Sequence, residues 1–286
     1  DHLRNFLSIK TIYHIPFILD FKPAYAMQIR KDWLDNVGIN KIPETWDEWK
    51  TVWRVFKEQD ANGDGDSTNE VPYAGDIYSM LPVFGINVSN RIGFTLDANG
   101  NYTLMYELPE FKLFLQEMRA LYNDGLLDKE FATRGTFVNN TELEKVVQAN
   151  IAGSLMTWAA NTRTTTEVLR EINPKATLIG VKPIQGPEGK RGIPSRVRLS
   201  GGATVTIAAK DRAENIIKFF NYVFSEEGIK LMSYGIEDVH HKIVDSKPVL
   251  KAPYNESFTA LRKEGLNFTP FPHLFTDDAY MQVTLG

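Results

Sequence analysis

The chain has 286 residues, which is long for one domain and suits two. Hydrophobic residues make up 43% and charged residues 24% of the sequence, as in ordinary globular proteins. The net charge is -4 and the basic residues are spread along the chain, so we expect no nucleic-acid partner. No apolar run approaches the roughly 18 residues that a membrane span needs. Cysteine is absent, which excludes disulfides, thiolate metal sites and cysteine nucleophiles.

The first elements expected along the chain alternate between strand and helix. Residues 12–19 are apolar and β-prone, which predicts a buried strand, and residues 24–30 predict a second strand. A short helix is expected over residues 31–37, and Gly38 should end it. Such alternation of strands and helices predicts an α/β architecture.

The clearest helical signal begins at Thr45. Thr45 and Glu48, three residues later, have the spacing of a capping box. The apolar residues that follow recur at helical spacing on one face, and they are Trp46, Trp49, Val52, Trp53 and Phe56. Three tryptophans on one face are also compatible with a platform for a ligand. We interpret them as core, because the stripe is continuous and apolar.

Helices and strands are also expected in the middle of the chain. A helix over residues 109–123 should bury the apolar side chains of Phe111, Phe114, Leu115, Met118, Leu121 and Tyr122. Residues 151–158 predict a strand, which a polar stretch follows through Arg163. Residues 177–184 predict another strand, and a basic loop follows over residues 186–200.

The last third of the chain continues the same pattern. A strand is expected over residues 203–208 and a helix over residues 213–224. The side chains expected to face inward from that helix are Ile216, Ile217, Phe220, Val223 and Phe224. The pair Glu226-Glu227 is interpreted as an exposed turn at the end of the helix.

Residues 60–70 form a polar, glycine-rich loop with the spacing of calcium ligands. Its oxygen-bearing candidates are Asp60, Asn62, Asp64, Asp66 (through its backbone carbonyl) and Glu70. Gly65 at the sixth position allows the sharp turn that such a loop needs. Glu70 stands at the eleventh position, whereas a regular EF-hand has its closing glutamate at the twelfth. We therefore expect an irregular, structural calcium site; the alternative is a solvated acidic turn.

Other titratable clusters are less specific. His240 and His241 are adjacent, so on a strand they point to opposite faces and do not easily share a metal. Asp277 and Asp278 are expected on the surface. The sequence has no serine-hydrolase elbow, Walker loop, H-E-x-x-H or Rossmann glycine pattern. Carboxylate pairs for glycoside hydrolysis form in space, so a carbohydrate-active enzyme stays an alternative.

Several stretches together resemble one family, the extracellular solute-binding proteins of ABC sugar importers. The resemblance is to its large lipoprotein branch, which includes binders of alginate oligosaccharides. It rests on residues 12–16 (IYHIP), residues 29–38 (IRKDWLDNVG) and residues 43–49 (PETWDEW). The loop over residues 60–72 is similar to the calcium loop of that branch, with one extra residue before its glutamate, and residues 234–248 (YGIEDVHHKIVDSKP) resemble a further segment.

The resemblance implies a two-lobed α/β fold of the type II periplasmic-binding-protein class, with a mixed sheet in the second lobe and the ligand in the cleft between the lobes. Residues 1–22 and 201–249 would belong to the first lobe, and residues 23–200 and 250–286 to the second. Neither end of the chain carries an initiator methionine or a signal peptide. In the layout that the resemblance implies, the opening βαβ units of the first lobe lie before residue 1, so we expect the first lobe to be incomplete here, with about a hundred residues preceding it.

The resemblance also implies where a sugar binds. Sugar rings have apolar faces that stack on aromatic side chains, and hydroxyls that need polar partners. We expect contacts from Asp20 after the first strand, from Tyr78 after the calcium loop and from Trp158 at a strand end. Further expected contacts are Asn161, Arg163, Arg196 and Arg198.

The function that the resemblance implies is that of a non-enzymatic receptor for a carbohydrate, most simply an oligosaccharide. It would act as a monomer outside the cytoplasmic membrane, as a tethered lipoprotein or in the periplasm, and would deliver its ligand to the permease subunits of an ABC transporter. Two alternatives stay open, a carbohydrate-active enzyme and a calcium-dependent interaction module. Turnover of glycans would favour the enzyme, and loss of partner binding with a chelator, without loss of fold, would favour the module.

Overall fold

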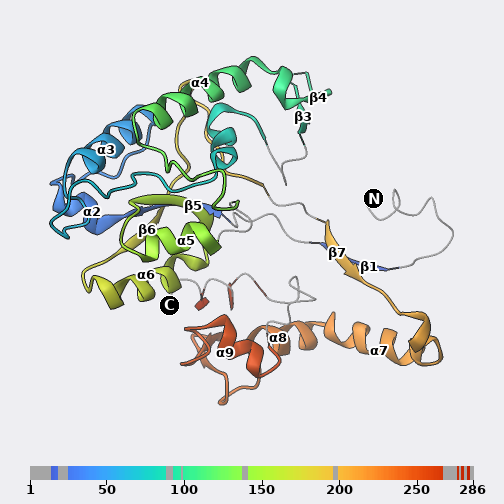
Figure 1. Cartoon of the computed structure of the whole chain (residues 1–286). Helices are drawn as coiled ribbons and strands as arrows, with labels where there is room; N and C mark the ends of the chain where they lie inside the picture. The colour runs from blue at the N-terminus through green and yellow to red at the C-terminus, as the bar shows by residue number, and fades with distance from the viewer. Residues whose placement is uncertain are drawn as a thin grey trace. The chain divides into compact units, whose positions relative to one another are not determined.

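The computed structural model describes residues 14–18, 25–87, 93–97, 99–136, 141–195 and 199–266, together with residues 276, 278, 279, 282 and 283. The chain divides into two compact units (Figure 1). Unit 1 contains residues 1–21 and 197–286, and unit 2 contains residues 22–196. Among the described residues, no helix combines the length and the apolar character that a membrane crossing requires.

Unit 2 is an α/β structure. Its strands are β2 (Tyr25–Arg30), β3 (Phe94–Leu96), β4 (Tyr102–Leu104), β5 (Ser154–Trp158) and β6 (Leu178–Val181). Its α-helices are α2 (Lys31–Asn36), α3 (Trp46–Glu58), α4 (Pro109–Asn123), α5 (Thr141–Gln148) and α6 (Asn161–Ile172). Two 3₁₀ helices, η1 (Ile77–Phe84) and η2 (Met105–Glu107), also lie in this unit.

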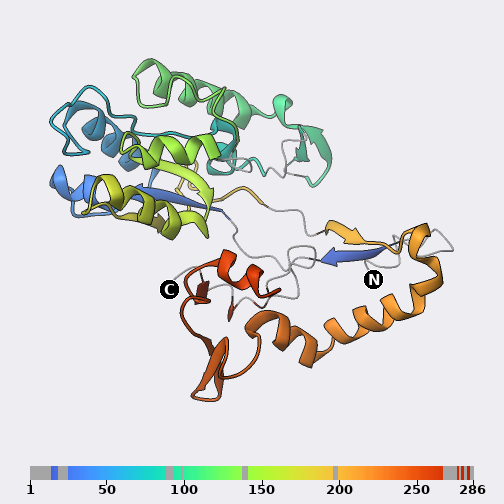
Figure 2. The same ribbon diagram turned by 60° about the horizontal axis from the view of Figure 1, so that its bottom comes forward.

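The central sheet of unit 2 has the strand order β5-β2-β6, and β2 runs antiparallel to both neighbours. The described strands of this sheet are thus all antiparallel, which differs from the expected mixed sheet, and an isolated parallel bridge joins Val71 to Ala152 outside the named strands. Successive residues of a strand face opposite sides. Met27 and Ile29 therefore enter a core with the tryptophans of α3, and Leu155 enters a second core with α5 and α6. Figures 1 and 2 show α3 and α4 on one face of the sheet and α5 and α6 on the other.

Helix α3 forms because its first turn is capped and its apolar stripe is buried. Thr45 Oγ1 accepts a hydrogen bond from the backbone N–H of Glu48 (3.3 Å), and Glu48 Oε2 accepts one from the N–H of Thr45 (3.1 Å). Trp46, Trp49, Val52, Trp53 and Phe56 are all buried. Trp53 also donates from Nε1 to the hydroxyl of Ser154 on β5 (2.9 Å). The interpretation of this stripe as core is confirmed.

Two helices without a clear sequence signal, α5 and α6, cover the second face of the sheet. Helix α5 buries Leu143 and two valines. Helix α6 begins at Asn161, in the stretch that we expected to be merely polar, and its buried residues are Thr165, Thr166 and Leu169. Threonine is a weak helix former and is not apolar. The inward face of α6 therefore lacks the apolar stripe that periodicity reveals.

Helix α4 has the predicted bounds and most of the predicted inward face. Its buried residues are Phe111, Phe114, Met118 and Leu121. Leu115 and Tyr122 were expected to be buried but are 47% and 43% exposed. Each follows a buried residue by one position, which on a helix turns a side chain away by about 100°.

In the hairpin of β3 and β4, the apolar side chains face solvent and a polar side chain is buried, which is the reverse of the usual pattern. Phe94 pairs with Leu104, and Leu96 pairs with Tyr102. All four side chains are exposed. Thr95, between them on β3, is buried, and its hydroxyl donates to a backbone carbonyl (3.1 Å). The hairpin therefore buries its polar side and exposes its apolar side.

Unit 1 is also built from strands and helices. Its strands are β1 (Ile15–Ile18), β7 (Leu199–Ala203), β8 (His241–Val244) and β9 (Lys247–Leu250). Its helices are α7 (Ala213–Val223), α8 (Glu226–Tyr234), α9 (Phe258–Lys263) and the 3₁₀ helix η3 (Ile207–Arg212). The strand predicted over residues 203–208 is wrong, because β7 ends at Ala203 and η3 begins soon after. β7 contains two glycines, Gly201 and Gly202, and because glycine is uncommon in strands the sequence did not predict a strand there.

Two further predictions in unit 1 are corrected. Ile217 on α7 was expected to face inward but is 42% exposed. Glu226 and Glu227 are exposed, as expected, but they begin α8 rather than end α7. The Ser225 hydroxyl caps this helix by accepting a hydrogen bond from the N–H of Gly228 (3.1 Å). Acidic residues in a first turn interact favourably with the helix dipole.

The described residues after residue 250 belong to unit 1. A buried cluster joins Tyr234 of α8 to Leu250, Leu261, Leu266, Ala279 and Val283. Gln282 reinforces the cluster by accepting a hydrogen bond from the N–H of Leu250 (2.8 Å). This grouping differs from the lobe assignment implied by the resemblance, which placed residues 250–286 with residues 23–200.

The capping box of α3 should contribute measurably to stability. We expect Thr45→Ala to lower the free energy of unfolding by about 1 kcal/mol, because the helix loses the acceptor for one of its first N–H groups. Thr51→Ala is the matched control, since Thr51 is exposed in the same helix and donates to the carbonyl of Asp47 (2.9 Å). Urea unfolding compares the two variants. Equal losses would contradict the capping role.

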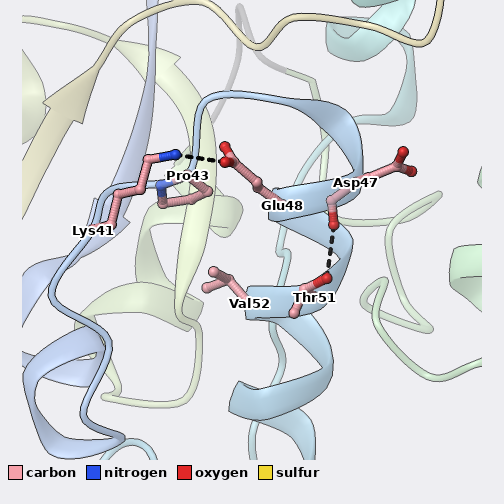
Figure 3. Close-up of a pocket in the computed structure, with 6 residues that line it drawn as sticks. All are labelled: Lys41, Pro43, Asp47, Glu48, Thr51 and Val52. Carbon is pink, nitrogen blue, oxygen red and sulfur yellow. Dashed lines mark hydrogen bonds and ion pairs between the residues drawn. The ribbon is translucent and has the colours of Figure 1, made fainter.

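Glu48 should also make the start of α3 sensitive to acid. Its carboxylate accepts hydrogen bonds from Lys41 (2.6 Å, Figure 3) and from the N–H groups of Glu44 and Thr45, which lower the pKa of Glu48 to about 2. The stability that the ionised form contributes is therefore present above about pH 4.5 and is lost as the pH falls towards 2.

Glu48→Gln should accordingly flatten the fall in melting temperature across that acidic range. Because the carboxylate is exposed, we expect a small effect that shrinks with added salt. The measurement is the melting temperature of both proteins against pH at two salt concentrations. Parallel curves for the two proteins would show that Glu48 makes no such contribution.

Candidate functional site

Three of the expected ligand contacts lie at one end of the β2–β5 pair. Trp158 ends β5 and stands directly opposite Tyr25, the first residue of β2. A two-residue turn follows, and helix α6 then begins at Asn161. Arg163 lies in the first turn of that helix. The structure thus brings Trp158, Asn161 and Arg163 together in one strand–turn–helix segment.

The indole ring of Trp158 packs on Tyr25. The two ring centroids are 4.6 Å apart, and the ring planes meet at 46°. Tyr25 is buried, whereas Trp158 is half-buried. Gln28 Nε2 donates to the backbone carbonyl of Trp158 (3.1 Å) and holds the end of the strand in place. A half-buried indole supported by a buried ring can present part of its surface to a ligand.

Polar groups of α5 and α6 surround the same strand end. Glu144 of α5 accepts hydrogen bonds from Asn161 Nδ2 (2.6 Å) and from the hydroxyl of Thr157 (3.3 Å). Thr157 and Trp158 are consecutive in β5, so they face opposite sides of the sheet. The strand end therefore combines an aromatic ring on one side with amide and carboxylate groups on the other.

The other expected contacts are less closely grouped. Tyr78 lies on η1, where its N–H donates to Asp76 (3.1 Å) and its ring stands 6.4 Å from that of Phe114. It packs against the same core as Trp158, and its role in binding stays a prediction. Arg163 donates to Glu167 one turn further along α6 (3.0 Å). Asp20, Arg196 and Arg198 lie outside the described residues.

Tyr25 and Glu144 belong to this site although the sequence did not indicate them. Tyr25 reaches Trp158 through the register of β2 against β5, which pairs residues far apart in the chain. Glu144 lies on a helix that we did not predict, 17 residues before Asn161. The sequence around Tyr25 offers one hint of a role in the site, an aromatic residue at the start of a strand. The sequence around Glu144 offers none.

The loop over residues 60–70 folds around its own side chains. The Asp60 carboxylate accepts hydrogen bonds from the N–H groups of Asp64 (3.1 Å) and Gly65 (2.9 Å). Gly65 has a φ of 91°, the left-handed conformation that glycine adopts easily. Asn69 donates to Asp64, and this bond, with a further one from the N–H of Asp66, lowers the pKa of Asp64.

Glu70 closes the loop with a buried carboxylate. The side chain is 2% exposed, and burial raises the pKa of Glu70. Its Oε1 accepts a hydrogen bond from the N–H of Ala61 (3.1 Å), whereas Oε2 has no partner among the described residues. A buried carboxylate oxygen without a partner is unfavourable. Its chemistry fits a cation ligand, although the described residues contain no group of three or more His, Cys, Asp or Glu side chains arranged to hold a metal.

The imidazole rings of His240 and His241 each make a hydrogen bond to a backbone group. Both are buried. His240 Nδ1 accepts a hydrogen bond from the N–H of Ile236 (3.0 Å), and His241 Nδ1 lies 2.9 Å from the carbonyl oxygen of Tyr234. Asp278 is exposed and accepts a hydrogen bond from the hydroxyl of Tyr234 (2.8 Å). These contacts fix the chain between α8 and β8.

A surface pocket of about 310 Å³ lies at the start of α3 (Figure 3). It is lined by Lys41, Pro43, Asp47, Glu48, Thr51 and Val52. Its charged groups already have partners, since Lys41 pairs with Glu48 and Asp47 pairs with Lys50 (3.0 Å). None of its lining residues is an expected ligand contact, and we assign no ligand to it.

Two proteins of Bacillus subtilis are similar in sequence to this chain. The chain is 31% identical over 228 residues to the polygalacturonan/rhamnogalacturonan-binding protein YtcQ of Bacillus subtilis, a match that covers 77% of this chain and 43% of that protein. It is 26% identical over 231 residues to the lipoprotein LipO of the same organism, covering 77% and 44%. The chain thus spans less than half the length of these relatives. No protein-family model matches it.

Solved structures similar to this chain include two binding proteins. The alginate-binding protein AlgQ2, in a crystal structure without calcium ion, superposes with a TM-score of 0.67 at 27% identity, over 96% of this chain and 58% of that one. The Streptococcus pneumoniae ABC-transporter substrate-binding protein FusA, in complex with kestose, gives a TM-score of 0.63 at 19% identity, over 100% and 63%. The second likeness shows the fold alone.

The chain therefore has the α/β fold of the extracellular solute-binding proteins, and the predicted fold class is confirmed. More particularly, the proteins similar to it include a polygalacturonan/rhamnogalacturonan-binding protein, an alginate-binding protein and a substrate-binding protein of an ABC transporter, which confirms the predicted resemblance.

Proposed function

We propose that the whole protein is the extracellular substrate-binding component of an ABC importer, which captures an oligosaccharide and passes it to permease subunits. The observation that carries this proposal is the pair of Tyr25 and Trp158 at the end of β5, with Asn161 and Glu144 on the other side of the same strand end, in a chain similar to a polygalacturonan/rhamnogalacturonan-binding protein. The indole ring suits the apolar face of a sugar ring, and the amide and carboxylate suit its hydroxyls.

The proposed activity is binding without turnover. The relatives named above include a polysaccharide-binding protein and a lipoprotein. These names support our proposal that the protein acts outside the cytoplasmic membrane, tethered by a lipid or free in the periplasm. We further propose that the receptor is a monomer. Oligosaccharides should remain intact after incubation with it. Release of shorter products would favour the carbohydrate-active enzyme instead.

We also propose that the loop over residues 60–70 binds a structural calcium ion. Its ligands would be the side-chain oxygens of Asp60, Asn62, Asp64 and Glu70 and the backbone carbonyl of Asp66. The support is the all-oxygen donor set and the buried Oε2 of Glu70 without a partner. Calcium accepts six to eight oxygen ligands in flexible geometry, which suits an irregular loop. When bound, the ion would offset the mutual repulsion of the carboxylates.

The binding proposal makes Trp158 the most sensitive position. In the full-length protein, Trp158→Ala should weaken oligosaccharide binding by about 1–3 kcal/mol, because a sugar ring loses its stacking partner. Tyr102→Ala is the matched control, since Tyr102 is an aromatic residue that is 85% exposed on β4. Calorimetric titration against a panel of oligosaccharides gives the affinities. Equal affinity in wild type and Trp158→Ala would refute the role of Trp158.

The calcium proposal predicts a chelator-sensitive melting temperature. Removal of calcium should lower it, because a ligand that binds the folded state stabilises by mass action, by about 2.7 kcal/mol at a hundredfold excess over Kd. Asp60→Ala should lower it with calcium present and abolish the response to chelator. Asp124→Asn, at an exposed aspartate beside Arg54 (3.7 Å), should keep the response. A wild-type protein that melts identically with and without chelator would contradict the site.

A further inference from the structure

Gln28 of β2 carries a buried amide whose orientation is fixed by Trp158. The side chain is fully buried, and its Nε2 lies 3.1 Å from the backbone carbonyl oxygen of Trp158. A carbonyl oxygen accepts hydrogen bonds and donates none, so the end of the amide that faces it must be the NH₂ group. The other end, Oε1, therefore points away from Trp158. It is buried and has no hydrogen-bond partner among the described residues.

This amide contributes little to the packing of unit 2. Gln28 stands opposite Leu155 on β5 and Gly180 on β6. Leu155 belongs to the apolar core that α5 and α6 cover. A buried oxygen without a hydrogen bond is unfavourable, and an apolar side chain of similar length would avoid that cost. The burial of Gln28 therefore does not by itself account for a glutamine at this position.

The hydrogen bond from Gln28 acts where β5 ends. The pair of Tyr25 and Trp158 is the last of the β2–β5 ladder that the structure describes, and α6 follows with Ala160, which has no capping side chain, as its N-cap. Gln28 and Tyr25 are three apart on one strand, so their side chains point to opposite faces of the sheet. The Trp158 ring lies with Tyr25. Gln28 therefore restrains the Trp158 backbone from the other face, without covering the exposed part of the indole.

We propose that Gln28 is a positioning residue that fixes the Trp158 indole for ligand binding. The proposal rests on the sugar-binding function proposed above and adds a residue that acts through Trp158 rather than on the sugar. The restrained carbonyl sets the direction in which the Trp158 side chain leaves the strand, and hence which part of its ring stays accessible beside Tyr25. A ring that is held before the ligand arrives loses less conformational freedom on binding, which favours affinity.

The test compares Gln28→Met with the wild type in the full-length protein. Methionine keeps the unbranched shape of glutamine but has no N–H to donate. The melting temperature should change little, because removal of the unpartnered buried oxygen offsets loss of the hydrogen bond. The affinity should fall about fivefold, because the indole is no longer held in one position. The probes are galacturonate, mannuronate and galactose oligomers of equal length, titrated by calorimetry.

A spectroscopic signal without any ligand separates positioning of the ring from a general loss of structure. Protein labelled with 5-fluorotryptophan gives a ¹⁹F resonance for each tryptophan, and Trp158→Phe identifies the resonance of Trp158. Gln28→Met should shift or broaden that resonance. The resonances of the tryptophans on α3, which are buried in the other core, should stay in place. If Gln28→Met does not fold, Gln28→Leu provides the same test.

Ser154→Ala is the matched control. Ser154 is a buried residue at the other end of β5, and its hydroxyl accepts a hydrogen bond from Trp53 (2.9 Å) and donates to the carbonyl of Pro72 (2.6 Å). The variant removes buried hydrogen bonds of the same strand away from Trp158. It should lower the melting temperature while the Trp158 resonance and the affinity stay as in the wild type.

The outcomes separate this inference from the proposed function. An unchanged Trp158 resonance or an unchanged affinity in Gln28→Met would overturn the role of Gln28 while leaving sugar binding intact. Equal changes in Ser154→Ala would also overturn it, because the effect would then be one of general strand stability. A wild type that binds neither these probes nor any other oligosaccharide would overturn the proposed function, whereas the resonance of Trp158 would still show whether Gln28 fixes the ring.

Discussion

The register of β2 against β5 is the constraint on which unit 2 depends. Consecutive pairs run from Tyr25 opposite Trp158 to Ile29 opposite Ser154. A shift by one residue would move Met27 and Ile29 from the tryptophan-lined core to the opposite face of the sheet. It would also separate Tyr25 from Trp158. The pairing that buries the core therefore also places the aromatic pair at the strand end.

The binding proposed here depends on a different tryptophan from those that form the core of unit 2. Four of the five tryptophans of the chain, Trp33, Trp46, Trp49 and Trp53, are at most 1% exposed and pack between the sheet and α3. Trp158 differs, because it is half-buried at the edge of that core. Aromatic residues contribute a large apolar area wherever they are buried. A site at the edge of the core thus gains rigidity from the core without being part of it.

Local sequence patterns predicted those parts of the structure that local interactions determine. The capping box of Thr45 and Glu48, the bounds of α4 and the sharp turn at Gly65 are of this kind, because their partners lie within a few residues. Helix α6 was missed because its buried face contains threonines. The contact between Glu144 and Asn161 depends on two helices packing on one sheet face, and no spacing in the sequence encodes it. The unpartnered oxygen of Glu70 likewise appears only when burial is known.

The central claim is that an oligosaccharide binds at the end of β5. A crystal structure of the full-length protein with a bound oligosaccharide tests it most directly. We expect a sugar ring against the exposed part of the Trp158 indole. An oligosaccharide bound elsewhere, with Trp158 covered by protein, would contradict the claim.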